Sequence, residues 1–170
     1  IEVCQVVRNA KNQIENEKVL AAIRGVFALQ NSAKKDSHED ELRQRLRYIL
    51  SQLGMSGERG THDIIDACCF VREHGGTVSS SGIRALCMAL CPDAPKSTEQ
   101  RMRRAMERSL RHIASLGLED YTNEVFVSYA THLFPFEEVR REMAAIQGRG
   151  RGGHVSVKTF LDGLMVLLDD

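Results

Sequence analysis

The stretch "SGIRALCMALCPDAPKSTEQRMRRAMERSLRHIASLG" at residues 81–117 decides the predicted fold, because it holds two helical patterns separated by a proline-containing turn. In its second half, apolar and small residues recur at the spacing of a helix face that packs on a core. This face comprises Met102, Ala105, Met106, Ser109, Leu110 and Ile113. Nearly opposite, one narrow arc holds Arg101, Arg104, Arg108 and Arg111. The pattern predicts an amphipathic helix with a positively charged outer side.

The charges of the 170-residue chain are balanced, with 23 lysines and arginines against 23 aspartates and glutamates. Any electrostatic function must therefore come from local segregation of charge. The length suits one domain with an appendage. The apolar runs are far shorter than the roughly 20 residues of a membrane helix, and the N-terminus lacks a signal-peptide pattern. We therefore expect a soluble, cytoplasmic protein with no membrane partner.

The five cysteines favour buried thiols over a disulfide framework or a zinc site. Their number is odd, and three of them lie in apolar helical stretches, which suits a reducing compartment. Cys87 and Cys91 are one helical turn apart, but structural zinc sites usually contain a Cys-x-x-Cys pair and this chain has none. The histidines have no metal-ligand spacing. We expect no metal and no cofactor.

The sequence also lacks the arrangements that are typical of enzymes. No G-x-S-x-G motif is present, and no nucleophile has a base beside it. The segment "GRGRGG" at residues 148–153 lacks the Gly-Lys-Ser/Thr ending of a phosphate-binding loop. It favours a disordered surface loop, with Arg149 and Arg151 as a mobile arm on a DNA backbone as the alternative.

Helical periodicity dominates the chain and predicts an all-α fold. A helical segment covers residues 1–30, and the polar stretch "NSAKKDSHEDE" that follows predicts a boundary or linker. We therefore divide the chain into residues 1–35, an N-terminal linker or dimerisation helix, and residues 36–170, a compact multi-helix effector domain. Gln13, Asn16 and Glu17 interrupt the apolar seam of the first segment, which argues against a long regular coiled coil.

Start and stop signals predict six or seven helices, with at most a small β element near residues 125–129. Ser37 with Asp40, and Ser97 with Gln100, resemble capping boxes. Gly75-Gly76 and Gly117 are stop signals, and residues 121–134 are ambiguous between helix and short strand. Beyond the first segment, the predicted helices cover about residues 37–53, 61–75, 82–90, 97–116, 135–147 and 156–168.

A short helix, a tight turn and an amphipathic helix with a basic outer face form the layout of a helix-turn-helix reader of DNA. Residues in the first half of such a helix usually reach base edges, and later ones bind phosphate. Gln100 suits adenine, and Glu107 suits the amino group of cytosine. The predicted base readers are Gln100, Arg103, Arg104 and Glu107, and the predicted phosphate ligands are Arg108 and Arg111. The alternative is a solvated helix face with ion pairs such as Arg103 with Glu107.

Residues 42–167 resemble the C-terminal effector domain of the sporulation response regulator (stage 0 sporulation protein A) family. The segment "LSQLGMSGERGTHDIIDAC" matches the opening of that domain, and "LCPD" matches the end of the first helix of its reader. The segment "RMRRAMERSLRHIASLG" has the rhythm of the family's recognition helix, and "SVKTFLDGLMVLL" lies where its last helix does. The resemblance implies an all-helical domain that binds double-stranded DNA and regulates transcription.

Within the recognition helix, Arg101, Arg104 and Ala105 match family residues; Arg101 and Arg104 are both predicted DNA contacts, and Arg104 is the best supported. The chain departs from the family at Arg103, where the family has an acidic residue, and at Glu107-Arg108, where it has a basic pair. The turn after "LCPD" is about three residues shorter, and residues 135–153 are an insertion.

Discrimination among genomic sites generally needs two half-sites, so we expect a homodimer or tandem copies on DNA. The resemblance also implies an upstream receiver domain, and RNA polymerase is a further candidate partner. The alternative function is a regulatory or protein-interaction module that uses the same helical scaffold without binding DNA.

Overall fold

The computed structural model describes residues 2–75, 78 and 82–169, and within the first 36 residues it describes the side chains of residues 17–26 and 28 only. The described residues form seven helices and no strand, which confirms the predicted all-α class. The chain divides into two compact units, residues 1–41 and 42–170.

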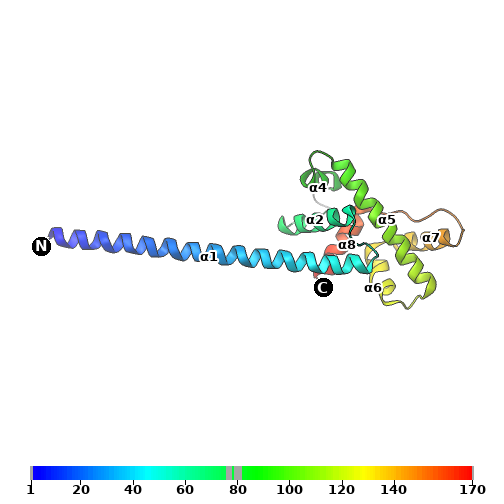
Figure 1. Cartoon of the computed structure of the whole chain (residues 1–170), viewed down its shortest axis with the longest axis horizontal. Coiled ribbons are helices and arrows are strands. Elements are labelled where there is room, and N and C mark those ends of the chain that lie inside the picture. The colour runs from blue at the N-terminus through cyan, green and yellow to red at the C-terminus, as the bar shows by residue number, and fades with distance from the viewer. Residues whose placement is uncertain (1, 76–77, 79–81, 170) are drawn as a thin grey trace. The chain divides into compact units, whose positions relative to one another are not determined.

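The first helix, α1 (Glu2–Gln52), is continuous through the predicted break at residues 31–41 (Figure 1). The helix end predicted near residue 30 and the capping box at Ser37 are therefore wrong. The stretch has no glycine or proline, and its lysines, glutamates and alanine are good helix formers, so nothing in it stops a helix that continues on both sides.

The two units use α1 differently. In residues 1–41 every described side chain is exposed, including Val19, Leu20, Ile23 and Val26, which are 45–55% exposed. The apolar residues before position 17 lie outside the described side chains. In residues 42–52, by contrast, Leu46 and Leu50 are fully buried in the core of the second unit. The last turns of α1 therefore belong to the compact domain.

Four of the other predicted helices are present within two residues of their predicted bounds. The ambiguous segment 121–134 contains a helix at Glu124–Leu133, which the Asn123 side chain caps by accepting hydrogen bonds from the backbone N–H groups of Val125 (3.0 Å) and Phe126 (3.1 Å). The predicted signals at residues 76 and 79–81 lie outside the described residues. The remaining helices are α2 (Arg59–Glu73), α4 (Ile83–Leu90), α5 (Pro95–Glu119), α6 (Glu124–Leu133), α7 (Phe136–Ile146) and α8 (Val157–Asp169).

Both predicted ends of α5 are wrong. The helix starts at Pro95 rather than after Ser97, because proline suits the first helical position, where no N–H is needed. The Ala94 carbonyl accepts the backbone N–H of Thr98 (3.1 Å), which leaves no role for the predicted Ser97 capping box. At the other end, α5 continues past Gly117 to Glu119.

Helix α5 is the centre of the second unit, where it contacts α2, α4, α6, α7 and α8 (Figure 1). Its predicted apolar face is confirmed, since all six members are buried. Gly117 extends this face. A Cβ atom there would overlap the Phe126 ring of α6 and the Met143 methyl of α7, so the glycine allows three helices to meet.

We predict that Gly117→Ala destabilises the domain. The overlap costs about 1–3 kcal/mol, which exceeds the gain of about 1 kcal/mol from placing alanine in a helix. Denaturant unfolding measures the change in free energy. Gly25→Ala is the control, because nothing lies within 4 Å of the added methyl group. Equal stability of the two variants would contradict the packing role of Gly117.

Candidate nucleic-acid interface

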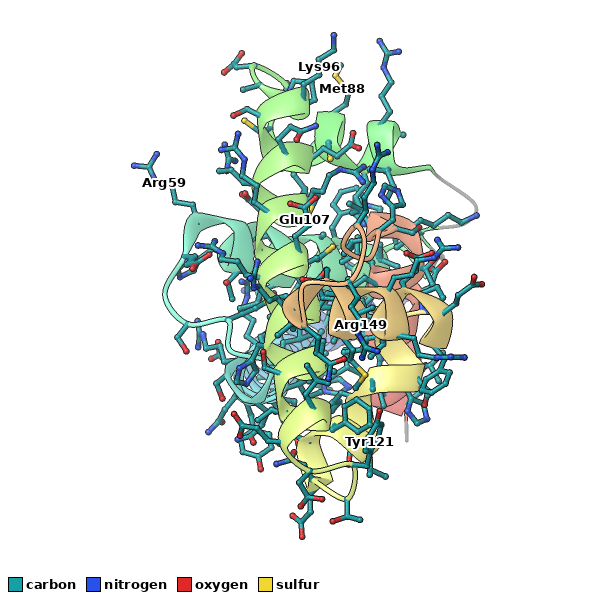
Figure 2. The ribbon with its side chains drawn as sticks, turned by 90° about the vertical axis from the view of Figure 1, so that its right-hand side faces the viewer. Arg59, Met88, Lys96, Glu107, Tyr121 and Arg149 are labelled. Atoms are coloured by element: carbon teal, nitrogen blue, oxygen red, sulfur yellow. The ribbon has the colours of Figure 1, made fainter. Side chains whose placement is uncertain are left out.

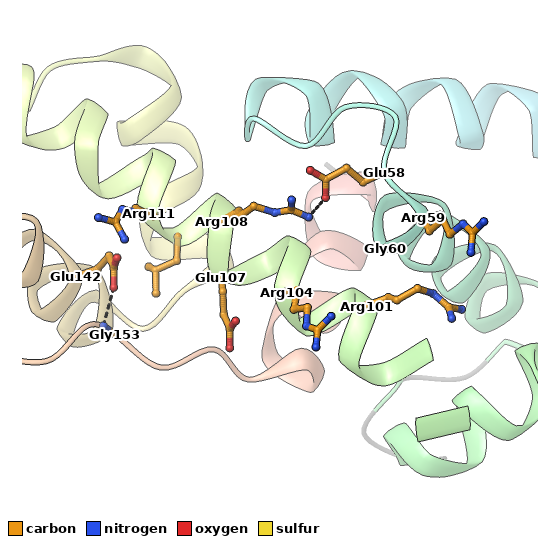
Figure 3. Close-up of a pocket in the computed structure, with 11 residues that line it drawn as sticks. Glu58, Arg59, Gly60, Arg101, Arg104, Glu107, Arg108, Arg111, Glu142 and Gly153 are labelled. Atoms are coloured by element: carbon orange, nitrogen blue, oxygen red, sulfur yellow. Dashed lines mark hydrogen bonds and ion pairs between the residues drawn. The ribbon is translucent and has the colours of Figure 1, made fainter. Parts of the chain in front are cut away.

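A groove of about 860 Å³ runs along the outer face of α5 (Figure 3). Its walls come from the start of α2, from α7 and from the loop before α8. Five arginines and three glutamates line it, so the lining is basic although the whole chain is neutral. The lining residues are Glu58, Arg59, Gly60, Arg101, Arg104, Glu107, Arg108, Leu110, Arg111, Glu142 and Gly153.

Four of the predicted DNA contacts lie on the open face of α5, and no described residue forms a hydrogen bond or ion pair with their side chains. Gln100, Arg104, Glu107 and Arg111 are all exposed. Figure 3 shows Arg104, Glu107 and Arg111 side by side along α5, with separate polar ends. Their polar atoms are therefore available to an external partner.

Arg101 is instead tied to the fold. Its Nε donates to Asp63 Oδ2 (2.6 Å) and its Nη2 to Asp63 Oδ1 (3.1 Å), which joins α5 to α2. Ser97 and Thr98 accept two more of its N–H groups (3.2 and 3.0 Å). The hydrogen bonds to Asp63 raise the pKa of Arg101 above its usual value.

Arg103 is tied down on the other flank of α5. Its Nη1 donates to the Val155 carbonyl (3.0 Å), and its Nη2 pairs with Glu99 (2.9 Å). The predicted partner of Arg103 was Glu107, so that pairing is wrong. Arg101 and Arg103 thus form contacts on the two sides of α5, and the exposed face between them is not covered by other parts of the described structure.

The glutamates of the groove differ in their availability. Glu58 forms an ion pair with Arg108 (Figure 3). Glu142 Oε2 accepts the backbone N–H of Gly153 (2.9 Å) and so holds the loop before α8. Glu107 alone among the three has no such contact within the described part of the chain. A polyanion would therefore meet Arg59, Arg104 and Arg111 with one unpaired carboxylate among them.

Sequence reasoning missed the groove residues outside α5. Arg59 begins α2 and is exposed, while Glu142 and Gly153 come from the insertion and the glycine-rich loop. Periodicity within one helix carries no signal for walls supplied by other helices. The packing of α2 and α7 on α5 brings these residues to the arginines.

The connection from α4 to α5 is four residues long, Cys91–Ala94. Backbone N–H groups of Cys91 and Ala94 donate to the carbonyls of Cys87 (2.9 Å) and Cys91 (3.2 Å), which closes a tight turn. Helices α2, α4 and α5 all contact one another. A short helix, a tight turn and a longer helix with an open basic face therefore form one packed unit.

The structure also bears on the metal, thiol and membrane expectations. Cys68, Cys69 and Cys87 are buried, as predicted, and Cys91 is partly buried. Burial raises the pKa of Cys68 and that of Cys87, the latter to about 11, so neither is a reactive thiolate at neutral pH. The described residues contain no cluster of three or more metal-ligating side chains. None of the helices described is both long and apolar enough to cross a membrane.

Comparison with known proteins places these features in a family. Residues 45–164 match the YcbB domain, and the chain belongs to this family. It is also similar to the transcriptional regulatory protein GlnL of Bacillus subtilis (strain 168), with 30% identity over 172 aligned residues that cover 88% of this chain. The chain spans about half the length of this relative, 55%. No solved structure shows a significant match.

The similarity to a transcriptional regulatory protein supports the broad part of the sequence prediction, that of a transcriptional regulator. Neither match names sporulation, so the resemblance to the sporulation regulator stays a prediction.

We predict that Arg101 contributes to stability. Arg101→Gln should lower the free energy of unfolding by about 1 kcal/mol, because it leaves Asp63, which is 19% exposed, without its ionic partner. Asp63→Asn should have a similar effect, and the double variant should lose less than the sum. Arg104→Gln is the control and should change stability by less than about 0.5 kcal/mol. Additive losses in the double variant would contradict a direct interaction.

Proposed function

We propose that this chain is the DNA-binding effector module of a transcriptional regulator, in which α4 and α5 form a helix-turn-helix. The main support for this proposal is the exposed side of α5. The side chains of Gln100, Arg104 and Arg111 lie there, exposed and without a hydrogen-bonding or ionic partner among the described residues. Unpaired guanidinium groups along one helix match the requirement for contacts with phosphates and guanine edges in the major groove. The similarity to a transcriptional regulatory protein supports the same function.

The contacts divide by position along α5. Gln100, Arg104 and Glu107 lie in the first half of the helix, where side chains reach base edges. Arg108 and Arg111 follow and suit phosphates. The Arg108–Glu58 pair is exposed, so a phosphate can replace the glutamate at small cost. Arg101 and Arg103 position the helix through Asp63 and the Val155 carbonyl.

Assembly on two half-sites is part of the proposal. Val19, Ile23 and Val26 recur at the three- and four-residue spacing of a coiled-coil seam and are exposed in the first unit. Pairing of two copies along this face would bury them and place two modules on one DNA. An upstream receiver domain of the response-regulator type would then act through residues 1–41. A protein-interaction module that does not bind DNA is the alternative, favoured by the three glutamates in the groove.

We predict that Arg104→Ala and Arg108→Ala weaken DNA binding in different ways. Arg104→Ala should cost about 1–3 kcal/mol on the specific site and relax discrimination at one base position, because a bidentate contact to guanine is lost. Arg108→Ala should weaken specific and random DNA alike and reduce the salt slope by about one unit. Gel-shift titration of genomic fragments and random duplex at two salt concentrations measures both effects.

Arg47→Ala, on α1 and outside the proposed helix-turn-helix, is the matched control for loss of one exposed positive charge. If the parent protein binds no duplex at either salt concentration, the DNA-binding proposal is wrong and the protein-interaction alternative holds. If all three variants bind like the parent, α5 is only a solvated face.

We predict that Ile23→Asp with Val26→Asp abolishes cooperative binding to two adjacent sites, because charges in the apolar seam oppose pairing of two copies. Affinity for a single half-site should stay within about twofold, since the reading helix is untouched. Ala21→Asp with Ala28→Asp adds the same charge on the opposite helix face and should retain cooperativity. Equal loss in both double variants would show that charge, not the seam, matters.

A further inference from the structure

A second depression in the surface lies at the C-terminal end of α5, beside α7. It has a volume of about 390 Å³, and its lining contains two arginines and no carboxylate, unlike the groove. An excess of guanidinium groups without acidic neighbours is the composition of an anion site. The lining residues are Leu118, Tyr121, Arg140, Met143, Ala144, Gln147 and Arg149.

The floor of this depression is fixed by packing. Met143 is buried, and the Tyr121 hydroxyl contacts its sulfur atom at 3.9 Å. The Tyr121 ring meets the Phe126 ring edge to face, with centroids 5.9 Å apart. Tyr121 nevertheless remains 64% exposed. The floor of the depression is therefore apolar and well packed, and Arg140 and Arg149 lie at its edge.

The two arginines keep their charge for an external partner. Arg140 is exposed, and no described residue forms an ion pair with it, because the glutamates of α7 are engaged elsewhere. Glu137 and Glu138 pair with Arg141 (2.9 and 2.8 Å), and Glu142 accepts the Gly153 N–H. Among the described residues, the Arg149 guanidinium donates a hydrogen bond to the side chain of Gln147 alone, which is neutral.

The loop that carries Arg149 is held at both ends, so the expectation of a disordered loop is wrong for this segment. At its start, the Arg149 backbone N–H donates to the Ala144 carbonyl (2.7 Å). At its end, the N–H groups of Gly153 and His154 donate to Glu142 (2.9 Å) and Glu138 (2.6 Å). A Cβ atom on Gly153 would overlap the Glu138 carbonyl and lie 2.9 Å from Leu110, so this part of the loop backbone packs between α7 and α5.

The depression lies on the side of α5 that carries the proposed readers. Leu118 is two helical turns beyond Arg111 and therefore has the same direction around the helix axis. In Figure 2, Glu107, Arg149 and Tyr121 are seen from the same side of the domain. Seven residues of helix span about 10 Å, equivalent to about three base-pair steps along a DNA strand.

We propose that Arg140 and Arg149 bind a backbone phosphate of the DNA that flanks the bases read by α5. This inference rests on the proposed function and adds a contact outside the recognition helix. Because both arginines are exposed, a free anion would stay largely hydrated and bind weakly there. A phosphate that is already held near the site by the contacts of α5 has a high effective concentration and needs little intrinsic affinity.

The test is a salt titration of binding with two duplexes and the full chain. One duplex ends at the specific site, and the other extends it by about 10 base pairs, one helical turn, on each side. Arg140→Gln with Arg149→Gln should lower the magnitude of the salt slope on the long duplex by about one unit, since the loss of one phosphate contact removes about 0.9. On the short duplex the variant should bind like the parent, and base discrimination should be unchanged on both.

The matched control is Arg141→Gln, which removes a paired positive charge one residue away. Equal effects of Arg140→Gln with Arg149→Gln on both duplexes, or an equal effect of Arg141→Gln, would overturn the flanking contact. Saturable binding of inorganic phosphate at these arginines, with DNA affinity unchanged in the variant, would identify a free-anion site instead and also overturn it. A parent that binds no duplex would overturn the proposed function as well, whereas a binding parent with unaffected variants overturns only this inference.

Discussion

Helix α5 packs on the hydrophobic core along one side and faces the solvent along the other, and the arrangement of the rest of the domain depends on this division. One arc is buried against five other helices, with Met102, Met106 and Ile113 fully enclosed. The opposite arc is so rich in arginine and glutamate that it can only face water or a charged partner. The hydrophobic arc therefore fixes the rotation of the helix, and that rotation in turn determines which charges face outwards.

The rotation of α5 also determines which arginines form contacts within the protein and which remain available to a partner. Arg101 and Arg103 lie at the two edges of the exposed arc, close enough to neighbouring elements to meet Asp63 and the Val155 carbonyl, and Arg103 also pairs with Glu99 one turn earlier on α5. Arg104 and Arg111 lie between the edges, beyond the reach of those groups. A single chemical group thus stabilises the scaffold at some positions and remains available for recognition at others. Position relative to the buried arc decides which role each arginine has.

The insertion that forms α7 and the following loop changes the surface around α5. Its glutamates are used within the protein: Glu137 and Glu138 pair with Arg141, while Glu138 and Glu142 accept loop N–H groups. Arg140 and Arg149 are therefore left without acidic partners among the described residues. Local pairing in the insertion produces a positive surface although the chain as a whole is neutral. Net charge alone would have hidden this feature.

The sequence by itself determined the helical class and the two faces of α5, because a 3.6-residue periodicity is a local property of the chain. It also indicated that Cys68, Cys69 and Cys87 are buried. It could not show that α1 continues through residues 31–41, because polar residues suit an exposed helix and a linker equally well. Only the tertiary structure decided that Gly117 is a site of helix packing, that Arg101 pairs with Asp63, and that Glu142 holds the loop. Each of these joins residues on different elements, and such contacts exist only once the helices have packed.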